Sequence, residues 1–195
     1  MIHEARQFSD RQIFNKWIIA PKNVMIENFF KRLELDHSPF NGVLCFAYVD
    51  HDAGNSLKLH TFCQIETGND PRISLLLSDI NYNLILRGWS LDQLSPLSDD
   101  QVKGLSLPVK PDWLEIYEPD TLGRIRNRVD IDQFRAPGFF DDLQVALFSN
   151  NQECRPEVVW VRFEEMSEDG KSFTGKLLNE PDADFGVHID DSPLF

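Results

Sequence analysis

The sequence predicts an α+β protein that is rich in antiparallel strands and divided into two α+β parts near residue 110. Three patterns support this prediction: an amphipathic helical repeat near the N-terminus, two pairs of β-type runs joined by turn residues, and a stretch of Pro, Gly, Ser and Asp between the two parts. Residues 1–110 are expected to form an α+β domain. Residues 111–195 are expected to form an acidic, β-rich domain, either a small curved sheet or a partial barrel.

The first local signal lies in residues 9–20. Ser9 and Gln12 have the spacing of a capping box, in which each side chain satisfies a backbone N–H of the first helical turn, and Pro21 ends the segment. We therefore expect a short helix here. The run IFNKWII within the segment is also compatible with a strand, so both alternatives stay open.

A clearer helical signal occupies residues 23–35. Apolar residues recur at positions i, i+3, i+4 and i+7, which places them on one face of a helix: Ile26, Phe29, Phe30 and Leu33. Asn23 is positioned to cap the first turn. The pattern predicts an amphipathic helix that ends at the turn-rich segment 37–42.

Strand-like runs follow at residues 43–49 and 57–65, and a loop rich in Asp, Asn and Gly joins them. Two β-type runs separated by turn residues predict a hairpin. Apolar and polar residues alternate in the second run, which predicts one buried face and one partly solvated face. Residues 73–77 and 83–89 are further strand candidates, and the second of these also fits the start of a helix.

Residues 95–111 contain Pro and Gly among Ser and Asp, a composition that predicts a linker between the two parts. The balance of charge along the chain also changes at this point. Beyond it, the short alternating segment 112–119 and the run DDLQVALF at 141–148 are both expected to be strands.

The clearest supersecondary signal is a second hairpin, with strands at 158–166 and 172–179. Asp169-Gly170 supplies its turn, because glycine accepts a positive φ without steric cost. Gly175 lies inside the second strand and predicts a bulge or a sharp bend. The alternation assigns residues of the first strand to two opposite faces: Val159, Val161 and Phe163 to one, and Val158, Trp160 and Arg162 to the other.

The number and spacing of the cysteines, and the lack of a secretory signal or a membrane-spanning run, predict a cytoplasmic protein. Cys45, Cys63 and Cys154 form no C-x-x-C pair, which argues against structural zinc and favours reduced thiols. Cys45 and Cys63 lie in strand-like runs and are expected to be buried. The N-terminus lacks the apolar core of a secretory signal, and no run of about 18 apolar residues is present to span a bilayer.

The net charge of −13 is unevenly distributed. Residues 1–110 hold 13 acidic and 11 basic residues, a balance of −2, whereas residues 111–195 hold 19 and 8, a balance of −11. A field of this sign repels nucleic acid and anionic lipid, so we expect neither nucleic acid nor a membrane as a partner. It attracts a basic protein and accelerates the encounter. The alternative is that the charge serves solubility alone.

Three stretches of the C-terminal part carry a resemblance to known proteins. They are FFDDLQVALF (139–148), PEVVWVRFE (156–164) and FTGKLLNEPDADFGVH (173–188). This signature, DDxQVxLF, PExxWVR and FxGxLLNEPxxxFGVH, resembles that of a family of uncharacterised bacterial proteins, whose members commonly have Gly-Asp where this chain has Asp190-Asp191. The resemblance covers residues 139–195 and implies a small β-rich domain but no activity. Related domains resemble those found among bacterial toxin-immunity genes.

The loop after the last strand is the first candidate site, because it concentrates acidic residues, a histidine and turn-forming residues. Polar loops on rigid sheets often carry recognition, so the sequence predicts the following partner-binding residues: Glu180, Asp182, Asp184, His188, Asp190 and Asp191. The structural alternative is a strand exit, in which Pro181 fixes φ while Phe185 and Val187 anchor the loop to the core.

Other candidates have simpler explanations. A divalent ion would suit the group Asp50, His51, Asp52 and His60, but Asp is favoured in turns for backbone reasons, so no metal site is predicted. The arginines between residues 124 and 135 are expected to pair with nearby acidic residues. The sequence has no nucleophile elbow and no phosphate-binding or dinucleotide-binding glycine loop, so no catalytic residue and no cofactor are predicted.

Two hypotheses of function follow. The first is a non-catalytic acidic module that binds a basic protein partner, as an immunity protein or antitoxin neutralises a toxin. The second is a small enzyme, or a metal- or ligand-binding domain, that uses carboxylates and histidine, with Glu180, Asp182, Asp184 and His188 as its first candidates. The second requires these side chains to converge in a pocket and to have perturbed pKa values.

Overall fold

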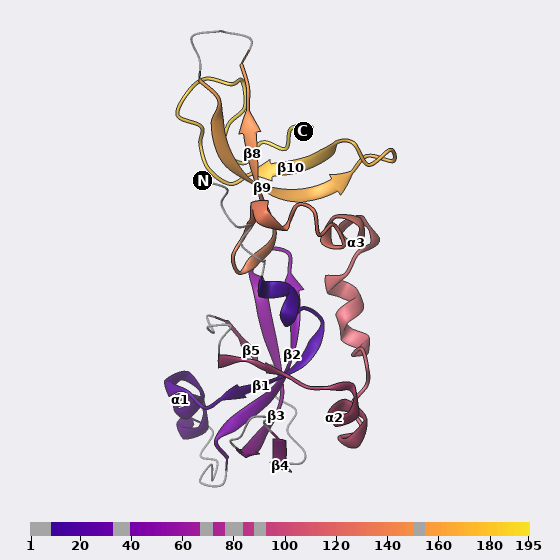
Figure 1. Cartoon of the computed structure of the whole chain (residues 1–195). Coiled ribbons are helices and arrows are strands. Elements are labelled where there is room, and N and C mark those ends of the chain that lie inside the picture. The colour runs from indigo at the N-terminus through magenta and orange to yellow at the C-terminus, as the bar shows by residue number, and fades with distance from the viewer. Residues whose placement is uncertain (1–8, 33–39, 67–71, 77–83, 88–92, 150–154) are drawn as a thin grey trace, which may run out of the picture. The chain divides into compact units, whose positions relative to one another are not determined.

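The computed structural model describes two compact units of the chain (Figure 1). The described residues are 9–32, 40–66, 72–76, 84–87, 93–149 and 155–195. Within them, the N-terminal unit consists of Ser9–Asp50 and Asn55–Asp112, and the C-terminal unit consists of His51–Gly54 and Trp113–Phe195. Each unit has one antiparallel sheet and a few short helices, which makes the fold α+β, as predicted. No helix of the described residues combines the length and the apolar character needed to cross a membrane.

The N-terminal unit is built on a six-stranded sheet with the order β4-β3-β2-β1-β6, in which β5 also pairs with β3. Its elements in chain order are η1 (Ser9–Gln12), β1 (Lys16–Pro21), α1 (Val24–Arg32), β2 (Gly42–Asp50), β3 (Gly54–Glu66), β4 (Arg72–Leu76), β5 (Ile85–Leu86), β6 (Ser95–Pro96) and α2 (Asp99–Gly104). The strand candidate at 73–77 overlaps β4, and the candidate at 83–89 contains β5. Ile18, Cys45 and Phe62 are fully buried in the core of this sheet.

The helix predicted for residues 9–20 is wrong beyond its first turn. Ser9–Gln12 forms one 3-10 turn, and Lys16–Pro21 is strand β1, which was the alternative for the run IFNKWII. β1 pairs with β2 along its whole length and with β6 on its other edge, and the residues from Trp17 to Ala20 are all buried. Sheet hydrogen bonds on both edges and burial on both faces stabilise the strand over a helix.

The helix predicted from residue 23 onward is confirmed as α1. Asn23 caps it, because its side-chain oxygen accepts a hydrogen bond from the backbone N–H of Ile26 at 3.0 Å. Ile26 is buried, as the predicted apolar stripe requires. The last part of the predicted helix, from Leu33, lies outside the described residues.

The first predicted hairpin is confirmed as β2 and β3, which are neighbours in the sheet. The connecting turn is only His51–Ala53, and Gly54 begins β3 with a φ of +75°. Cys45 and Cys63 are buried and unbridged, as predicted, and burial raises the pKa of both thiols, that of Cys63 to about 12. Cys154 lies outside the described residues.

The linker predicted for residues 95–111 is only partly correct, because this segment contains strand β6 and helix α2. A complete capping box starts α2: Ser98 Oγ accepts from the Gln101 N–H at 3.3 Å, and Gln101 Oε1 accepts from the Ser98 N–H at 2.8 Å. The Ser-x-x-Gln spacing is the sequence signal that predicts this helix. Along the chain, the division between the two units falls between Asp112 and Trp113.

The C-terminal unit is built on a four-stranded sheet with the order β10-β9-β8-β7, which is not closed into a barrel. After η3 (Asp112–Tyr117), its elements are α3 (Asp120–Arg126), η4 (Asp132–Phe134), β7 (Arg135–Ala136), β8 (Phe139–Leu147), β9 (Glu157–Met166) and β10 (Phe173–Leu177). The strand expected at residues 112–119 is wrong. Leu114 is buried and Ile116 is 82% exposed, although the alternation of a strand would place both on one face.

The predicted C-terminal hairpin is confirmed as β9 and β10. Gly170 in its turn has a φ of +68°, and the register shifts between Thr174 and Gly175, which is the predicted bulge. A Cβ atom on Gly175 would overlap Cγ1 of Val161, so the neighbouring strand leaves room only for glycine. Val159, Val161 and Phe163 share one face, as predicted, and this face is fully buried.

Two segments cover the inner face of this sheet. Leu122 and Ile125 of α3 pack on one end, and the chain terminus packs on the other through Val187 and Phe195. The Phe195 N–H donates to the Phe173 carbonyl at 2.8 Å, and the two phenyl rings stack with centroids 5.3 Å apart. The terminal segment therefore lies along the edge of β10 and protects it from pairing with another chain (Figure 1).

Candidate functional site

Glu180 and His188, two of the predicted site residues, contact each other in the loop that follows β10. His188 Nδ1 lies 2.8 Å from Glu180 Oε1, and Glu180 Oε2 accepts a hydrogen bond from the Ile189 N–H at 2.8 Å. The Ile189 N–H and the His188 ring hold the pKa of Glu180 below its ordinary value, and the Glu180 carboxylate raises the pKa of His188. The side chains are 52% and 68% exposed, so water screens the pair.

Asp184 and Asp191 hold the same loop through its own backbone. Asp184 Oδ1 accepts from the Gly186 N–H at 2.9 Å, and Asp191 Oδ2 accepts from the His188 N–H at 2.7 Å. These are local side-chain-to-backbone turns, which fix the path of the chain without a partner strand. Both carboxylates stay exposed, so their negative charges are held at defined positions on the surface.

Asp182 and Asp190 are held by residues of the sheet. The backbone N–H of Asp182 donates to the Glu157 carboxylate at 2.9 Å, while its own side chain is exposed. Asp190 pairs with Lys176 of β10 at 2.7 Å. Its φ of +70° lies in the left-handed region, which favours glycine and which Asp tolerates better than most residues.

Of the four residues considered for acid–base chemistry, the loop brings one pair into contact. Glu180 and His188 meet, whereas the Asp184 carboxylate is bound to a backbone N–H and Asp182 is anchored by its main chain on β9. Within the part of the chain that the structure describes, no group of three or more His, Cys, Asp or Glu side chains is arranged to hold a metal ion. The predicted site residues thus form an ordered acidic loop, with an ion pair and no convergence of all four acid–base candidates.

The acids and histidines near the β2–β3 turn, considered above as metal ligands, are also separated. Three of them form ion pairs with different residues: Asp50 with Arg87 at 3.1 Å, Asp52 with Arg162 at 3.3 Å, and His51 with Asp141 at 2.9 Å. His60 lies edge-on to Trp17 with ring centroids 5.1 Å apart, and burial lowers its pKa. The turn interpretation of these residues therefore fits better than the metal interpretation.

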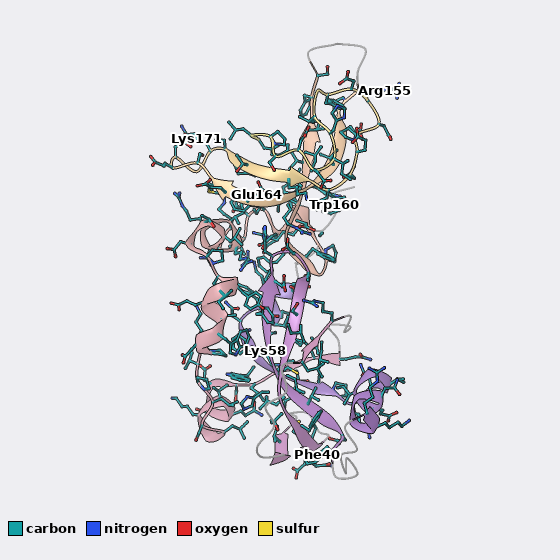
Figure 2. All side chains as sticks on the ribbon, turned by 180° about the vertical axis from the view of Figure 1, so that it is seen from behind. Phe40, Lys58, Arg155, Trp160, Glu164 and Lys171 are labelled. Carbon is teal, nitrogen blue, oxygen red and sulfur yellow. The ribbon has the colours of Figure 1, made fainter. Side chains whose placement is uncertain are left out.

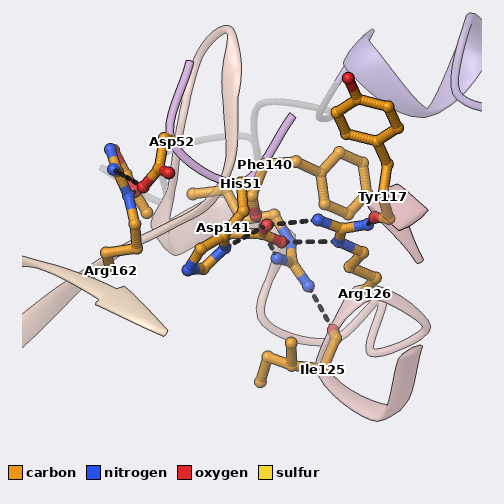
Figure 3. Close-up of polar contacts among 10 residues, drawn as sticks. His51, Asp52, Tyr117, Ile125, Arg126, Phe140, Asp141 and Arg162 are labelled. Atoms are coloured by element: carbon orange, nitrogen blue, oxygen red, sulfur yellow. Dashed lines mark hydrogen bonds and ion pairs between the residues drawn. The ribbon is translucent and has the colours of Figure 1, made fainter. Parts of the chain in front are cut away.

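Sequence reasoning missed a buried charged cluster centred on Asp141 (Figure 3). Asp141 is 2% exposed and forms a bidentate pair with Arg126, in which Nε donates to Oδ1 at 2.9 Å and Nη2 donates to Oδ2 at 2.6 Å. Nδ1 of His51 lies 2.9 Å from the same Oδ2. Arg126 also donates from Nη1 to the carbonyl of Tyr117 at 2.7 Å.

The chemistry of this cluster is that of a neutralised ion pair. Burial, the largest single effect, would raise the pKa of Asp141, but the hydrogen bonds from Arg126 and His51 and the electrostatic attraction of both groups together hold the pKa below its ordinary value. Among the described residues, Nε2 of His51 makes no hydrogen bond. The carboxylate therefore orients the imidazole, and the cluster joins α3 and β8 to the turn His51–Ala53.

Three of the four arginines between residues 124 and 135 pair with aspartates, as predicted, and the fourth, Arg124, bonds to the backbone. Arg135 is buried, pairs with Asp132 at 2.9 Å and donates to the carbonyl of Ile125 at 2.6 Å. Arg124 donates to backbone carbonyls of the β9–β10 turn. These cations are used to connect elements of the C-terminal unit and do not form a phosphate-binding group.

The outer face of the C-terminal sheet, opposite the buried face on which Val187 packs, carries apolar residues. Ala146 pairs with Val158, and both point away from the buried face of the sheet. Val158 is 58% exposed, and Trp160, two residues further along the same strand and on the same face, is half-buried (Figure 2). Phe148, which directly follows β8, is 75% exposed. We call these four residues the outer strip.

Trp160 connects the outer strip to the acidic loop. Its backbone N–H donates to Asn179 Oδ1 at 2.7 Å, and its carbonyl accepts from the Leu178 N–H at 2.9 Å. Glu157, at the start of the same strand, binds the backbone of Asp182 and Ala183. The apolar strip and the acidic loop therefore belong to one rigid, hydrogen-bonded part of the unit.

Comparisons with family models, with curated proteins and with solved structures found no match to this chain. The resemblance to a family of uncharacterised bacterial proteins therefore stays a prediction that depends on three stretches of sequence. Function is inferred from the chemistry of the described surface alone.

Proposed function

We propose that the C-terminal unit is a non-catalytic module that binds a basic protein partner. The outer strip of Ala146, Phe148, Val158 and Trp160 carries this proposal, because it exposes apolar surface on the unit that holds the fixed carboxylates, and Trp160 is hydrogen-bonded to Asn179 at the start of the acidic loop. An apolar, aromatic-containing centre with a polar rim is the usual composition of a protein interface. A more specific version of this proposal is that the partner is a toxin, which the protein neutralises as an immunity protein does.

The charge of the unit supports a basic partner over a neutral one. Five cationic side chains are already ion-paired with aspartates: Arg126, Arg128, Arg135, Arg162 and Lys176. Within the described residues, the following exposed acids of the unit have no ion pair with Lys or Arg: Glu115, Asp120, Glu164, Glu165, Glu168, Asp169, Asp182, Asp184 and Asp191. The uncompensated surface charge is negative, so it attracts Lys and Arg side chains and repels acidic partners.

The acidic loop is ordered before a partner arrives. Glu157 accepts the N–H groups of Asp182 and Ala183 at 2.9 and 3.3 Å, and Asp184 accepts the Gly186 N–H at 2.9 Å. Ordering loops and side chains on association costs free energy. A loop that is already fixed avoids this cost, which favours its use as a recognition surface.

A charge-matched pair of variants tests the electrostatic part of the proposal. The probe is a peptide of alternating Lys and Leu, with a Glu–Leu peptide as its negative counterpart, and binding is followed by Trp fluorescence from low to physiological salt. Asp182→Asn with Asp184→Asn keeps one acceptor oxygen in each side chain but removes two charges, and we expect about fivefold weaker binding. Asp99→Asn with Asp100→Asn in α2 makes the same change in net charge and is expected to leave binding almost unchanged. Equal losses in both variants, or binding that does not depend on salt, would count against the proposal.

A second pair of variants tests the apolar part. Val158→Thr with Trp160→Thr keeps residues that favour strands while removing apolar surface from the outer strip. We expect weaker binding of the Lys–Leu peptide, measured by calorimetry because the variant lacks the Trp160 signal, with an unchanged salt dependence, because the carboxylates remain. The control is Val109→Thr, at a residue of the N-terminal unit that is 87% exposed. If the control weakens binding as much as the strip variant, the outer strip is not the contact surface.

A further inference from the structure

A pocket of about 240 Å³ lies between η4 and the turn that joins β9 to β10. Ile125 of α3 and Leu143 of β8 form its deep wall, where both are buried in the same apolar cluster. Phe134, which is 45% exposed, lines it as well. The outer strip and the acidic loop do not contribute to this pocket, so it is a separate feature of the C-terminal unit.

The volume of the pocket and the residues that line it limit the size and the polarity of a ligand. Pockets for drug-sized ligands commonly measure about 300–1,000 Å³, so this one suits a smaller molecule. Met166 and Phe173 add further apolar surface, and Phe173 is held in place by its stack with Phe195 at 5.3 Å. A small ligand with one apolar body fits these walls, because burying apolar surface is the main source of affinity in such a site.

The charged residues that line the pocket are both cationic. Arg128 is bound to Asp130 by two hydrogen bonds, of 2.7 and 2.5 Å, so its charge is already compensated. Lys171 is exposed in the hairpin turn, and its ammonium group has no carboxylate partner among the described residues. The turn that presents Lys171 is ordered, because Asp169 accepts the Lys171 N–H at 3.1 Å. One cation is therefore held beside an apolar cavity.

We propose that this pocket binds a small apolar carboxylate, such as a medium-chain alkyl or an aryl acid. The apolar body occupies the space between Ile125, Leu143 and Phe173, and the carboxylate lies at the Lys171 ammonium. A single available cation matches a single negative charge, whereas a phosphate with a higher charge requires more donors. This inference does not depend on the proposed protein-binding function, because none of the residues that carry it belongs to the outer strip or the acidic loop.

Octanoate, octan-1-ol and acetate separate the apolar and the electrostatic contributions when they are titrated into the full chain by calorimetry. We expect saturable one-to-one binding of octanoate, about fivefold weaker binding of octan-1-ol, and no binding of acetate. Lys171→Ala should reduce octanoate to the affinity of octan-1-ol, and Lys171→Arg should retain the preference for the acid. Lys103→Ala, an exposed lysine of α2, is the matched control and should change neither affinity.

A substitution in the lining of the pocket tests the apolar contribution. Phe134→Ala removes apolar surface from a residue that is already 45% exposed, so the fold should be retained, which near-UV circular dichroism checks. It should weaken octanoate and octan-1-ol by the same factor. The proposal is overturned if octanoate shows no saturable binding, if it binds no more tightly than octan-1-ol, or if Lys171→Ala and Lys103→Ala have the same effect.

Discussion

Asp141 of β8 and Arg126 of α3 form a bidentate ion pair inside the C-terminal unit, with side chains that are 1% and 3% exposed. Removing two charges from water is costly, and only mutual pairing with further hydrogen bonds offsets this cost. Arg126 makes such a bond to the carbonyl of Tyr117, and Asp141 makes one to His51. The pair therefore sets the position of α3 on the sheet more than it adds net stability.

Breaking this pair on one side is expected to be strongly destabilising. Arg126→Met leaves the Asp141 carboxylate buried without its cation, and we expect the free energy of unfolding to fall by about 3–5 kcal/mol. Arg126→Met with Asp141→Leu removes both charges and should recover much of this loss. Urea unfolding followed by circular dichroism measures both. Asp130→Asn breaks the exposed pair with Arg128 and serves as the control, with an almost unchanged midpoint. A double variant no more stable than the single one would contradict this account.

The same carboxylate is expected to limit the stability of the C-terminal unit in acid. The pKa of Asp141 is lower in the folded chain than its ordinary value of 3.8. A group with a depressed folded pKa contributes stability that is present above the ordinary pKa and lost as the pH falls through the folded pKa. The urea midpoint should therefore decrease as the pH falls below 3.8. Asp141→Asn should flatten this dependence, and an unchanged pH profile in that variant would exclude Asp141 as the cause.

Whether the sequence predicted an element correctly depended on whether one of its faces is buried and the other is exposed. β9 has one buried and one partly exposed face, so the alternation from Val158 to Phe163 predicted its position and which residues share a face. β1 is buried on both faces and shows no alternation, so a helical interpretation competed with the correct strand. α2 was missed although Ser98 and Gln101 show its capping box, because the surrounding composition was read as a linker.

The buried ion pair could be predicted only in part. Alternation places Asp141 on the same face as Leu143, and a carboxylate on a buried face requires a cation. The choice of Arg126 over the neighbouring arginines depends on how α3 packs on the sheet, which no local pattern encodes. In the acidic loop, the residues were correctly placed after the last strand, but the contact of Glu180 with His188 depends on backbone angles that sequence does not specify.

Gly175→Ala is expected to destabilise the C-terminal hairpin. The added Cβ would overlap Val161 Cγ1 and would lie 2.8 Å from the Arg162 carbonyl oxygen, so the strands must move apart, at a cost of about 1–3 kcal/mol. Gly123→Ala is the matched control. Gly123 lies in α3, where a Cβ atom would meet no other atom within 4 Å, and alanine there should stabilise the unit by about 0.5–1 kcal/mol. Changes in unfolding free energy of the same sign for both variants would refute the steric explanation.

Substitutions of Asp190 test whether its left-handed backbone conformation strains the acidic loop. Its φ of +70° is accessible to glycine without strain, so Asp190→Gly should retain or increase stability despite the loss of the exposed pair with Lys176. Asp190→Ala loses the same pair but keeps the strain, and it should be about 1 kcal/mol less stable than Asp190→Gly. Thermal and urea unfolding of the two variants give this difference directly. Equal stabilities would mean that the loop relaxes away from the left-handed conformation.

Glu180→Gln is expected to lower the pKa of His188 toward its ordinary value of 6.5. The Glu180 carboxylate raises this pKa through a hydrogen bond and its charge, and glutamine keeps an acceptor oxygen without the charge. A raised histidine pKa means that the pair stabilises the loop below pH 6.5 and that this contribution is lost as the pH rises through the folded pKa. NMR titration of the His188 ring measures the change at the residue itself, which is preferable because both side chains are solvent-exposed. Asp182→Asn, which removes a nearby charge that does not contact His188, should leave its titration unchanged, and a similar shift in both variants would assign the effect to the general negative field of the loop.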